Sequence, residues 1–502
     1  MASVPIIDDR SMRSSGRFPL DNPAIWTAIQ VLFLLVGLAP FVLPEFPVET
    51  DVYKHVMVGR VLAEHADTVL RYSDYYNVSW FPAPTYLGEW VLAVFVKVCD
   101  PAFAAKLYYI AFAAGLWLCC RFYMPRIGLP SYGALLLFPL LHTFYAFSGF
   151  LPFVGSIAVY PLLLAVLIGH EPGWRKSFFL AGILVLLHGF HLVGVAIGCF
   201  TVFLFAIDTS DSRRPRISWP LIAAMIPAAL LMVSYFLRIP KSLTSMQFHS
   251  PLGQVKAYLG YNIWTLSSFS GWLFLLLIVT LACAAMWQAH NRTFANGRLL
   301  LLALVLVAIG LVMPYQSGNE FVIGSRTLPF ALVAAVGALS WNTKPLRSAI
   351  GLTCLFLLVS SVLNTQKAFA VQPAFREFLS GMPSVRLGSK LLIMVDDVTL
   401  GGNQYINPFN SIEDAYTIYR GGSNPYVLAE PWVPTGATFL RTKYNLTYTS
   451  KYIATVPDYH GVSKDYDYIV CWGGLADPRR VIGGEAPLVF QNGRLSIYSG
   501  SR

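Results

Sequence analysis

Charged side chains are scarce in this sequence. Asp, Glu, Lys and Arg make up 12% of its 502 residues, whereas they make up roughly 25% of an average soluble domain. Hydrophobic residues make up 56%. This composition excludes an ordinary soluble globular protein and indicates an integral membrane protein with many spans. The net charge of +10 fits that class, because the cytoplasmic loops of membrane proteins are rich in Lys and Arg.

Several kinds of functional motif are also missing. The seven cysteines are scattered and form no CxxC pair, so neither a disulfide framework nor a zinc site is indicated. There is no GxxxxGK[ST] phosphate loop, HExxH helix, GxSxG elbow or GxGxxG turn, which weakens the case for ATP-driven transport, zinc proteolysis or serine hydrolysis. Charges deep within apolar runs are scarce, which argues against a proton-coupled transporter. No basic run with interleaved aromatic residues indicates a nucleic-acid partner.

Long apolar segments dominate the first two thirds of the chain. A helix needs about 20 residues to cross the hydrocarbon core of a bilayer, and several segments reach that length only if they extend into their flanks. We expect about eleven transmembrane helices, at Ile25–Leu43, Phe103–Arg121, Ser131–Phe147, Phe150–Gly169, Phe178–Leu187, His191–Ile207, Leu221–Phe236, Gly271–Trp287, Leu299–Val312, Thr327–Leu339 and Ser348–Leu363.

One further apolar segment, Tyr86–Cys99, is short and contains Glu89 and Lys97. If it crossed the membrane, the basic loops that follow would lie opposite the basic N-terminus. If it lies along the surface, those loops share the cytoplasmic side with the N-terminus, as the positive-inside rule favours. We therefore expect a surface helix here, with the N-terminus inside and the C-terminus outside.

The chain changes character after about residue 365. Residues 1–365 are expected to form the transmembrane part, with a long first outer loop at 44–100. Residues 366–502 contain short strand-like runs at Lys390–Asp397 and Tyr466–Gly473, and a helical stretch near Phe375–Leu379. The pair Asn492–Gly493, between alternating apolar residues, predicts a hairpin in which both turn residues take positive φ. We expect a small C-terminal α/β domain outside the membrane.

The first outer loop opens with an unusual group of ionisable residues, in the stretch "FPVETDVYKH". Asp51, Lys54 and His55 lie at i, i+3 and i+4, on one face of any helix that begins there. Two alternatives to a catalytic role remain open. Asp51 could lie in the first turn of that helix, where the dipole favours a carboxylate, or the carboxylate could simply be solvated at the interface.

Two other polar clusters fall at span ends on the expected outer side. His188 and His191 in "HGFH" have the spacing of a metal pair, but no carboxylate is near in sequence; interfacial hydrogen bonding and contact with a phosphate are the alternatives. Arg326 opens a span, and its planar fork suits a phosphate, although it could instead snorkel to a lipid headgroup. Glu320 would be its partner or a loop charge.

The stretch "YAFSGFLPFVGS" (Tyr145–Ser156) is a glycine- and aromatic-rich break between two expected spans. It is typical of a tight turn that leads the chain back into the membrane. Its aromatic side chains could also line a groove for a sugar or an isoprenoid.

The layout of the chain resembles the GT-C superfamily, membrane glycosyltransferases that use polyprenyl-phosphate-linked sugars. The resemblance consists of a first span, a long outer loop that opens with an acid ("ETD"), surface helices, many spans and a C-terminal outer domain. Short stretches that resemble sequences of this superfamily occur at "DVYKH", "FSGFLPFVGSIAV", "LLHGFHLVG" and "GSRTLPFAL".

The resemblance implies a mainly α, GT-C-like polytopic fold and the transfer, with inversion, of a sugar to a glycan, lipid or protein. It implies Asp51 as the general base. Glu49 is the alternate, because Thr50 separates the two acids that often stand together in this family. The residues expected to bind the donor phosphate are Arg326, Lys54, His55, His188 and His191, and those expected to contact the acceptor or line a groove are Tyr86, Glu89 and Glu320.

A lipid-phosphate leaving group is a weak base, so the site needs a carboxylate for the acceptor proton and cations for the phosphate. Some members of the superfamily use a divalent metal, but no compact set of oxygen ligands is evident here, and we expect metal-independent catalysis. The expected location is a bacterial inner (cytoplasmic) membrane, with the site and the C-terminal domain on the periplasmic, outer face.

Two functions of other classes stay open at this point. A transporter or flippase for a lipid-linked glycan would use the same cationic groove without needing Asp51. An assembly or scaffold subunit would bind a partner through its tail and would not need Arg326.

Overall fold

The structure is a computed structural model. It describes residues 22–78, 83–169, 173–208, 216–238, 246–291, 293–317, 320–321, 323–341, 343–395, 400, 406–425, 437–439, 464–473 and 486–500.

The described part of the chain is mainly helical. Its α-helices are α1 (Pro23–Val42), α2 (Val52–Glu64), α3 (Tyr86–Val98), α4 (Pro101–Arg126), α5 (Phe144–Phe147), α6 (Leu151–Gly169), α7 (Trp174–Phe190), α8 (Leu192–Ala206), α9 (Trp219–Phe236), α10 (Pro251–Ile263), α11 (Ser268–His290), α12 (Gly297–Val312), α13 (Leu328–Ala338), α14 (Thr343–Leu379) and α15 (Glu413–Arg420). The 3₁₀ segments are η2 (Tyr72–Asp74), η3 (Ser131–His142), η5 (Gly324–Thr327) and η6 (Met382–Ser384).

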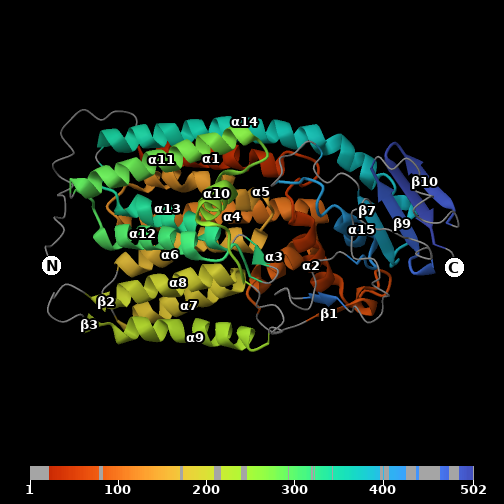
Figure 1. Ribbon diagram of the computed structural model, residues 1–502, viewed down its shortest axis with the longest axis horizontal. Coiled ribbons are helices and arrows are strands. Elements are labelled where there is room, and N and C mark those ends of the chain that lie inside the picture. Colours follow the sequence, from red (N-terminus) through yellow and green to blue (C-terminus); the bar gives the residue numbers. More distant parts are fainter. Residues whose placement is uncertain are drawn as a thin grey trace.

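The strands are short and gather mostly at one end of the molecule. They are β1 (Tyr76–Val78), β2 (Ile207–Asp208), β3 (Arg216–Ile217), β4 (Met246–Gln247), β5 (Gln316–Ser317), β6 (Glu320–Phe321), β7 (Leu391–Val395), β8 (Ala437–Phe439), β9 (Tyr468–Trp472), β10 (Leu488–Asn492) and β11 (Leu495–Ser499). In Figure 1 the bundle helices run along the long axis, with α2, α15 and the sheet beyond one end and β2–β3 at the other.

Each of the eleven predicted spans falls on a helical segment. Six helices are long and apolar enough to cross a membrane, namely α1, α4, α6, α9, α11 and α14, and three shorter apolar ones are η3, α8 and α12. The chain is therefore an integral, multi-pass membrane protein. The exact number of crossings stays a prediction, and helix α10 lies in a segment for which no helix was expected.

One predicted span has a different backbone. Ser131–Phe147 was expected to be one α-helix, but residues Ser131–His142 form the 3₁₀ helix η3, and Phe144–Phe147 form the separate turn of α5. A 3₁₀ helix rises about 2 Å per residue, so the 12 residues of η3 extend about as far as 16 residues of α-helix. Nearly all of η3 is buried, because α1, α4 and α14 pack around it.

Helix α3 occupies the segment that was expected to lie along the surface. It has 13 residues, fewer than the about 20 that a crossing needs. Instead of entering the bundle alone, it packs side by side with α2, where a Cβ on Gly59 would come within 2.9 Å of Leu92. The two helices therefore pack together at the end of the bundle, where α3 also contacts α4, α6 and α7 (Figure 1).

Helix α14 does not stop where the last span was expected to end. It has 37 residues, which corresponds to about 55 Å, nearly twice the about 30 Å of a hydrocarbon core. It runs without a break through residue 365, the predicted limit of the transmembrane part. The helical stretch expected near Phe375–Leu379 is its last turn.

The sheet beyond the bundle has the strand order β10-β11-β9-β7. Strands β7 and β9 pair in parallel, and every residue of both is buried. The predicted hairpin is present, but its turn lies one residue later than expected. Asn492 pairs with Leu495, so the turn residues are Gly493 and Arg494, and of these Gly493 alone has positive φ, at 52°. Glycine in the first turn position is typical of a II′ hairpin.

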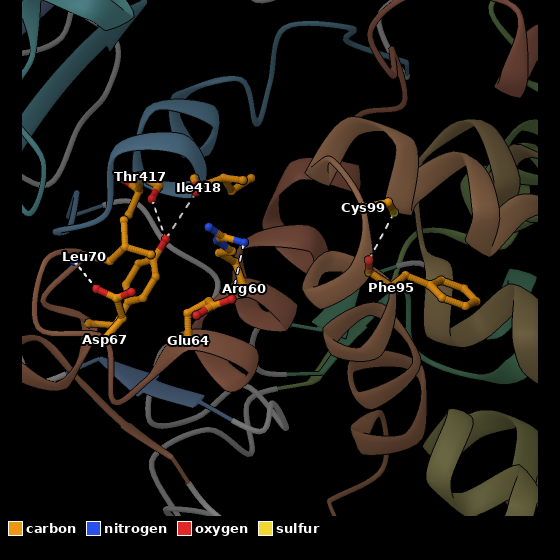
Figure 2. Close-up of polar contacts among 9 residues, drawn as sticks. Arg60, Glu64, Asp67, Leu70, Phe95, Cys99, Thr417 and Ile418 are labelled. Atoms are coloured by element: carbon orange, nitrogen blue, oxygen red, sulfur yellow. Dashed lines mark hydrogen bonds and ion pairs between the residues drawn. The ribbon is translucent and has the colours of Figure 1, made fainter.

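Helix α15 is fixed against the first outer loop (Figure 2). The hydroxyl of Tyr72 donates to the carbonyl of Thr417 at 2.7 Å, and the N–H of Gly422 donates to the carbonyl of Leu70 at 2.7 Å. Figure 2 shows Arg60 and Glu64 of α2 facing the end of α15 that carries Thr417 and Ile418. The C-terminal segment therefore rests on residues that precede it by more than 340 positions.

This contact predicts that a side chain at Gly421 lowers the stability of the fold. Its φ is +72°, and a Cβ there would overlap the carbonyl of Leu70. Gly421→Ala should therefore lower the melting temperature in detergent, because the backbone strain adds to the loss of the contact, together about 1–3 kcal/mol. Gly128→Ala is the matched control, since Gly128 has a φ of +76° and nothing within 4 Å of its would-be Cβ. Equal losses for the two variants would contradict the importance of the contact.

Candidate functional site

The acidic loop after α1 (residues 44–51) is held by the C-terminal part of helix α14. The side-chain amide of Gln372 accepts from the N–H of Phe46 at 2.8 Å and donates to its carbonyl at 3.1 Å. Arg376, one turn later, pairs with Glu45 at 2.7 Å. These contacts fix the point from which the chain enters residues 47–52.

The same loop is held on its other side by the turn after η3. The N–H of Thr50 donates to the carbonyl of Phe147 at 3.4 Å, and the N–H of Asp51 donates to that of Ser148 at 2.9 Å. Gly149 follows with a φ of +72°, and a Cβ there would lie 2.6 Å from the nitrogen of Val52. The glycine of "FSGF" is therefore required by a close approach of two backbones.

Asp51 precedes the first residue of α2, but its carboxylate makes no hydrogen bond that caps the helix. It lies instead 3.2 Å from the ammonium of Lys54 and 3.5 Å from the side-chain nitrogen of Asn410. About a fifth of its side chain is exposed, 22%. The predicted common face of Asp51 and Lys54 is thus present, with the carboxylate reachable from solvent.

Glu49 lies two residues earlier in a very different environment. Its side chain is 1% exposed, and neither carboxylate oxygen has a hydrogen-bond partner among the residues that the structure describes. Burial raises the pKa of Glu49 from 4.5 to about 8, and the N–H groups of Glu49 and Val48 and the charge of Lys106 offset only part of this. At neutral pH Glu49 is mainly a neutral acid.

Arg326 lies at the start of α13, in η5, and is 5% exposed. Its guanidinium carbon sits 5.2 Å from the ring centre of Phe150 and 5.5 Å from that of Phe153. One of its terminal nitrogens is 2.8 Å from Nε2 of His191. Two aromatic faces and a histidine therefore hold the arginine within the protein, so it does not snorkel to lipid.

His191 makes two contacts that one neutral imidazole cannot satisfy together. The N–H of Val193 donates to Nδ1 at 3.1 Å, and an N–H of Arg326 lies 2.8 Å from Nε2. A neutral imidazole has one acceptor nitrogen, so one of its nitrogens carries a proton that faces another donor. This happens at the N-terminus of α8, where the helix dipole favours negative charge.

The remaining predicted phosphate contacts lie around these residues. His55 is 8% exposed, its Nδ1 has no partner in the described part of the chain, and it is close enough to interact electrostatically with His191. Burial and the charge of Lys54 lower the pKa of His55 to about 4, against the charge of Asp51. His188 is buried in the last turn of α7. Lys54 stays cationic: burial lowers its pKa, but the charges of Asp51, Glu413 and Asp414 raise it more.

The three residues expected to contact the acceptor or line a groove are less clustered. Tyr86 and Glu89 lie in the first turn of α3, which packs on the start of α6, since a Cβ on Gly88 would come within 3.1 Å of Pro152. Glu89 is fully buried, 3.5 Å from the hydroxyl of Thr85. Glu320 is in strand β6, and its side chain lies outside the described residues.

Three residues of the site were not predicted from the sequence, and all belong to the segment before and within α15. Asn410 contacts Asp51, and the charges of Glu413 and Asp414 act on Lys54. The one local signal was the pair of acids in "NSIEDAY", which also suits an ordinary helix start. Among the described residues no three His, Cys, Asp or Glu side chains lie close enough together to hold a metal ion.

The environment of Glu49 predicts a pH effect on stability. Because its folded-state pKa lies above its unfolded value, the stabilisation is complete below pH 4.5 and is lost as the pH rises through 8. Between pH 6 and pH 8 the loss should be about 2 kcal/mol. Glu49→Gln should therefore melt at a higher temperature than the wild type at pH 8, with a smaller difference at pH 6.

Glu64→Gln serves as the control, since it removes a carboxylate at the other end of α2, 3.7 Å from Arg60. A Glu49→Gln difference that is the same at pH 6, 7 and 8 would show that Glu49 is ionised throughout.

Comparison with known proteins gives a match of fold. No family model matches the chain, and no curated protein sequence does. A crystal structure of ArnT from Cupriavidus metallidurans, bound to undecaprenyl phosphate, superposes with a TM-score of 0.56 at 13% sequence identity. The match covers 95% of this chain and 98% of that chain. The chain therefore shares the fold of ArnT along nearly its whole length.

Proposed function

We propose that this protein is a membrane glycosyltransferase that moves a sugar from a polyprenyl-phosphate donor to a glycan, lipid or protein acceptor, with inversion. The observation that carries the proposal is the placement of a reachable carboxylate and a buried arginine on two sides of one turn. Ser148 holds the backbone of Asp51, and Phe150, two residues later, packs on Arg326. The crystal structure of ArnT with undecaprenyl phosphate supports a donor of this class through the shared fold.

The donor phosphate would bind at Arg326 and His191. A phosphate oxygen placed between the guanidinium and the Nε2–H accepts from both and so removes the conflict between two donors. The N-terminus of α8 favours the same charge. Lys54, His55 and His188 complete the set of cations and N–H donors that would stabilise the charge developing on the leaving phosphate.

Asp51 would take the proton from the acceptor hydroxyl. The acceptor oxygen attacks the anomeric carbon from the face opposite the phosphate, the carbon–oxygen bond to the phosphate breaks, and the lipid phosphate leaves with the bonding electrons. A general base must come within hydrogen-bonding distance of the hydroxyl. The side chain of Asp51 is 22% exposed, whereas Glu49 is buried, so Asp51 is the better candidate. Lys54 orients the carboxylate of Asp51 through their contact at 3.2 Å.

The remaining parts of the proposal concern location and metal. The site would face the outer side of the membrane, because strand β3, which begins at Arg216, lies at the end of the bundle opposite α2 and the sheet (Figure 1), and basic residues favour the cytoplasmic side. The tail beyond α14 would bind the acceptor, with Tyr86, Glu89 and Glu320 as further candidates. Catalysis would not depend on a metal, so EDTA should leave turnover unchanged.

The test of the base uses purified protein in detergent with undecaprenyl-phosphate sugars and acceptor extracts. Asp51→Asn should reduce turnover by about 10²–10⁴-fold, the usual contribution of a general base, while leaving donor binding and the melting temperature near those of the wild type. Asp74→Asn is the control, since it removes an exposed acid of the same loop that pairs with Arg71. Normal turnover by a folded Asp51→Asn variant would refute this role.

The phosphate role makes a separate prediction. Arg326→Lys keeps the charge but loses the planar fork and the stacking between two phenyl rings, so it should weaken donor binding by about tenfold or more. Arg121→Lys is the matched control, because its guanidinium lies 5.3 Å from the ring of Trp117, far along the chain from the site. Product formation in detergent also excludes a flippase, which needs a two-sided membrane.

A further inference from the structure

The segment that leads into helix α15 lies against the start of α2, where the proposed base is. The backbone N–H of Asn407 donates to the hydroxyl of Thr50 at 3.1 Å, across 357 positions of the chain. Three residues later, the side-chain nitrogen of Asn410 lies 3.5 Å from Oδ1 of Asp51. Two successive contacts therefore place this C-terminal segment along the acidic loop, where it forms one wall of the site.

Buried apolar side chains fix the segment on both sides of Asn410. Phe409 is fully buried, and its ring centre lies 4.4 Å from that of Trp472 in β9 and 5.1 Å from that of Phe375 in α14. Ile412, on the other side, is fully buried too. The position of Asn410 relative to the acidic loop is therefore set by the core of the C-terminal part and not by a surface loop.

Both neighbours of the Asp51 carboxylate contact the same oxygen. The ammonium of Lys54 lies 3.2 Å from Oδ1, and the amide nitrogen of Asn410 lies 3.5 Å from the same atom. The other oxygen, Oδ2, has no ion pair or hydrogen bond among the residues that the structure describes. Contacts from two different elements restrict the rotation of the carboxylate, and Oδ2 is left for the proton of an incoming hydroxyl.

The same segment also acts on Lys54. Glu413 and Asp414 are at most 1% exposed, and their negative charges favour the ammonium form of Lys54. Asp414 is held in turn by the side-chain amide of Asn424, which donates to its Oδ1 at 2.9 Å. The C-terminal part therefore influences both members of the pair formed by Asp51 and Lys54.

We infer that Asn410 is a positioning residue for the proposed general base, and that the C-terminal part thereby completes the catalytic site. This inference rests on the proposed function and adds to it a residue that acts through Asp51. With Lys54, Asn410 would hold Oδ1 so that Oδ2 faces the acceptor hydroxyl. A contact that only attached the C-terminal part would not need to end on this carboxylate, because the backbone bonds at Leu70 and Thr50 already join the two segments.

The experiment measures kcat and the KM for the donor in purified protein in detergent. The donors are undecaprenyl phosphate carrying a hexose, an N-acetylhexosamine or a pentose, given with the acceptor extract. Asn410→Ala should lower kcat by about tenfold, the effect of one hydrogen bond to a charged group. The donor KM, and the affinity for undecaprenyl phosphate measured by tryptophan fluorescence, should change by less than about twofold, since the phosphate contacts do not involve Asn410.

Three further variants make the result interpretable. Asn410→Asp keeps the size of the side chain but presents an acceptor to Asp51 in place of a donor, so it should lower kcat at least as much as Asn410→Ala. Asn407→Ala is the matched control in the same segment, since the contact of Asn407 with Thr50 is made by the backbone, and it should leave kcat unchanged. In an Asp51→Asn background, Asn410→Ala should lower kcat by less than about twofold further, because a residue that acts through Asp51 is then without effect.

The outcomes separate the inference from the proposed function. Wild-type kcat in folded Asn410→Ala and Asn410→Asp variants, as judged by their melting temperatures, would overturn the inference and leave the proposed function standing. An equal loss from Asn410→Ala with and without Asp51→Asn would also overturn it, because Asn410 would then act independently of the base. If the wild type transfers none of these sugars, the proposed function itself fails.

Discussion

Two backbone hydrogen bonds hold the acidic loop against the turn that follows η3, and the arrangement of the site depends on them. They require two main chains to approach so closely that a Cβ on Gly149 would lie 2.6 Å from the nitrogen of Val52. The turn that accepts these bonds also carries Phe150, which supports Arg326. Residues 147–150 therefore contact both the backbone of Asp51 and the guanidinium of Arg326.

The surroundings give two neighbouring acids opposite properties. Asp51 has a cation at 3.2 Å and contact with solvent. Glu49 is enclosed, and burial raises its pKa to about 8. The free energy needed to remove the charged carboxylate from water is larger than the stabilisation from the nearby N–H groups and Lys106. The loop thus presents one charge to its surroundings and keeps a second carboxyl neutral.

Much of the fold could be predicted from hydropathy, because the thickness of the bilayer sets both the length and the composition of a crossing helix. The 3₁₀ form of Ser131–His142 could not, since its residues are as apolar as those of an α-helical span and the packing of α1, α4 and α14 around it is not a local property. For the site, polar residues at span ends identified Arg326 and His191. Asn410 and Glu413 were missed because they meet α2 across more than 350 residues, and only the folded chain brings them there.

The unbroken course of α14 joins the bilayer to the site mechanically. Its first half lies in the bundle, and its second half carries Gln372, which holds both backbone groups of Phe46. Because helix α14 is about 55 Å long, a change of a few degrees in its tilt within the membrane would displace its C-terminal end by several ångströms. Helices adjust their tilt to the thickness of the surrounding hydrocarbon. The position of the acidic loop is therefore coupled to the lipids in which the protein resides, and bilayer thickness becomes a variable that acts on the site from a distance.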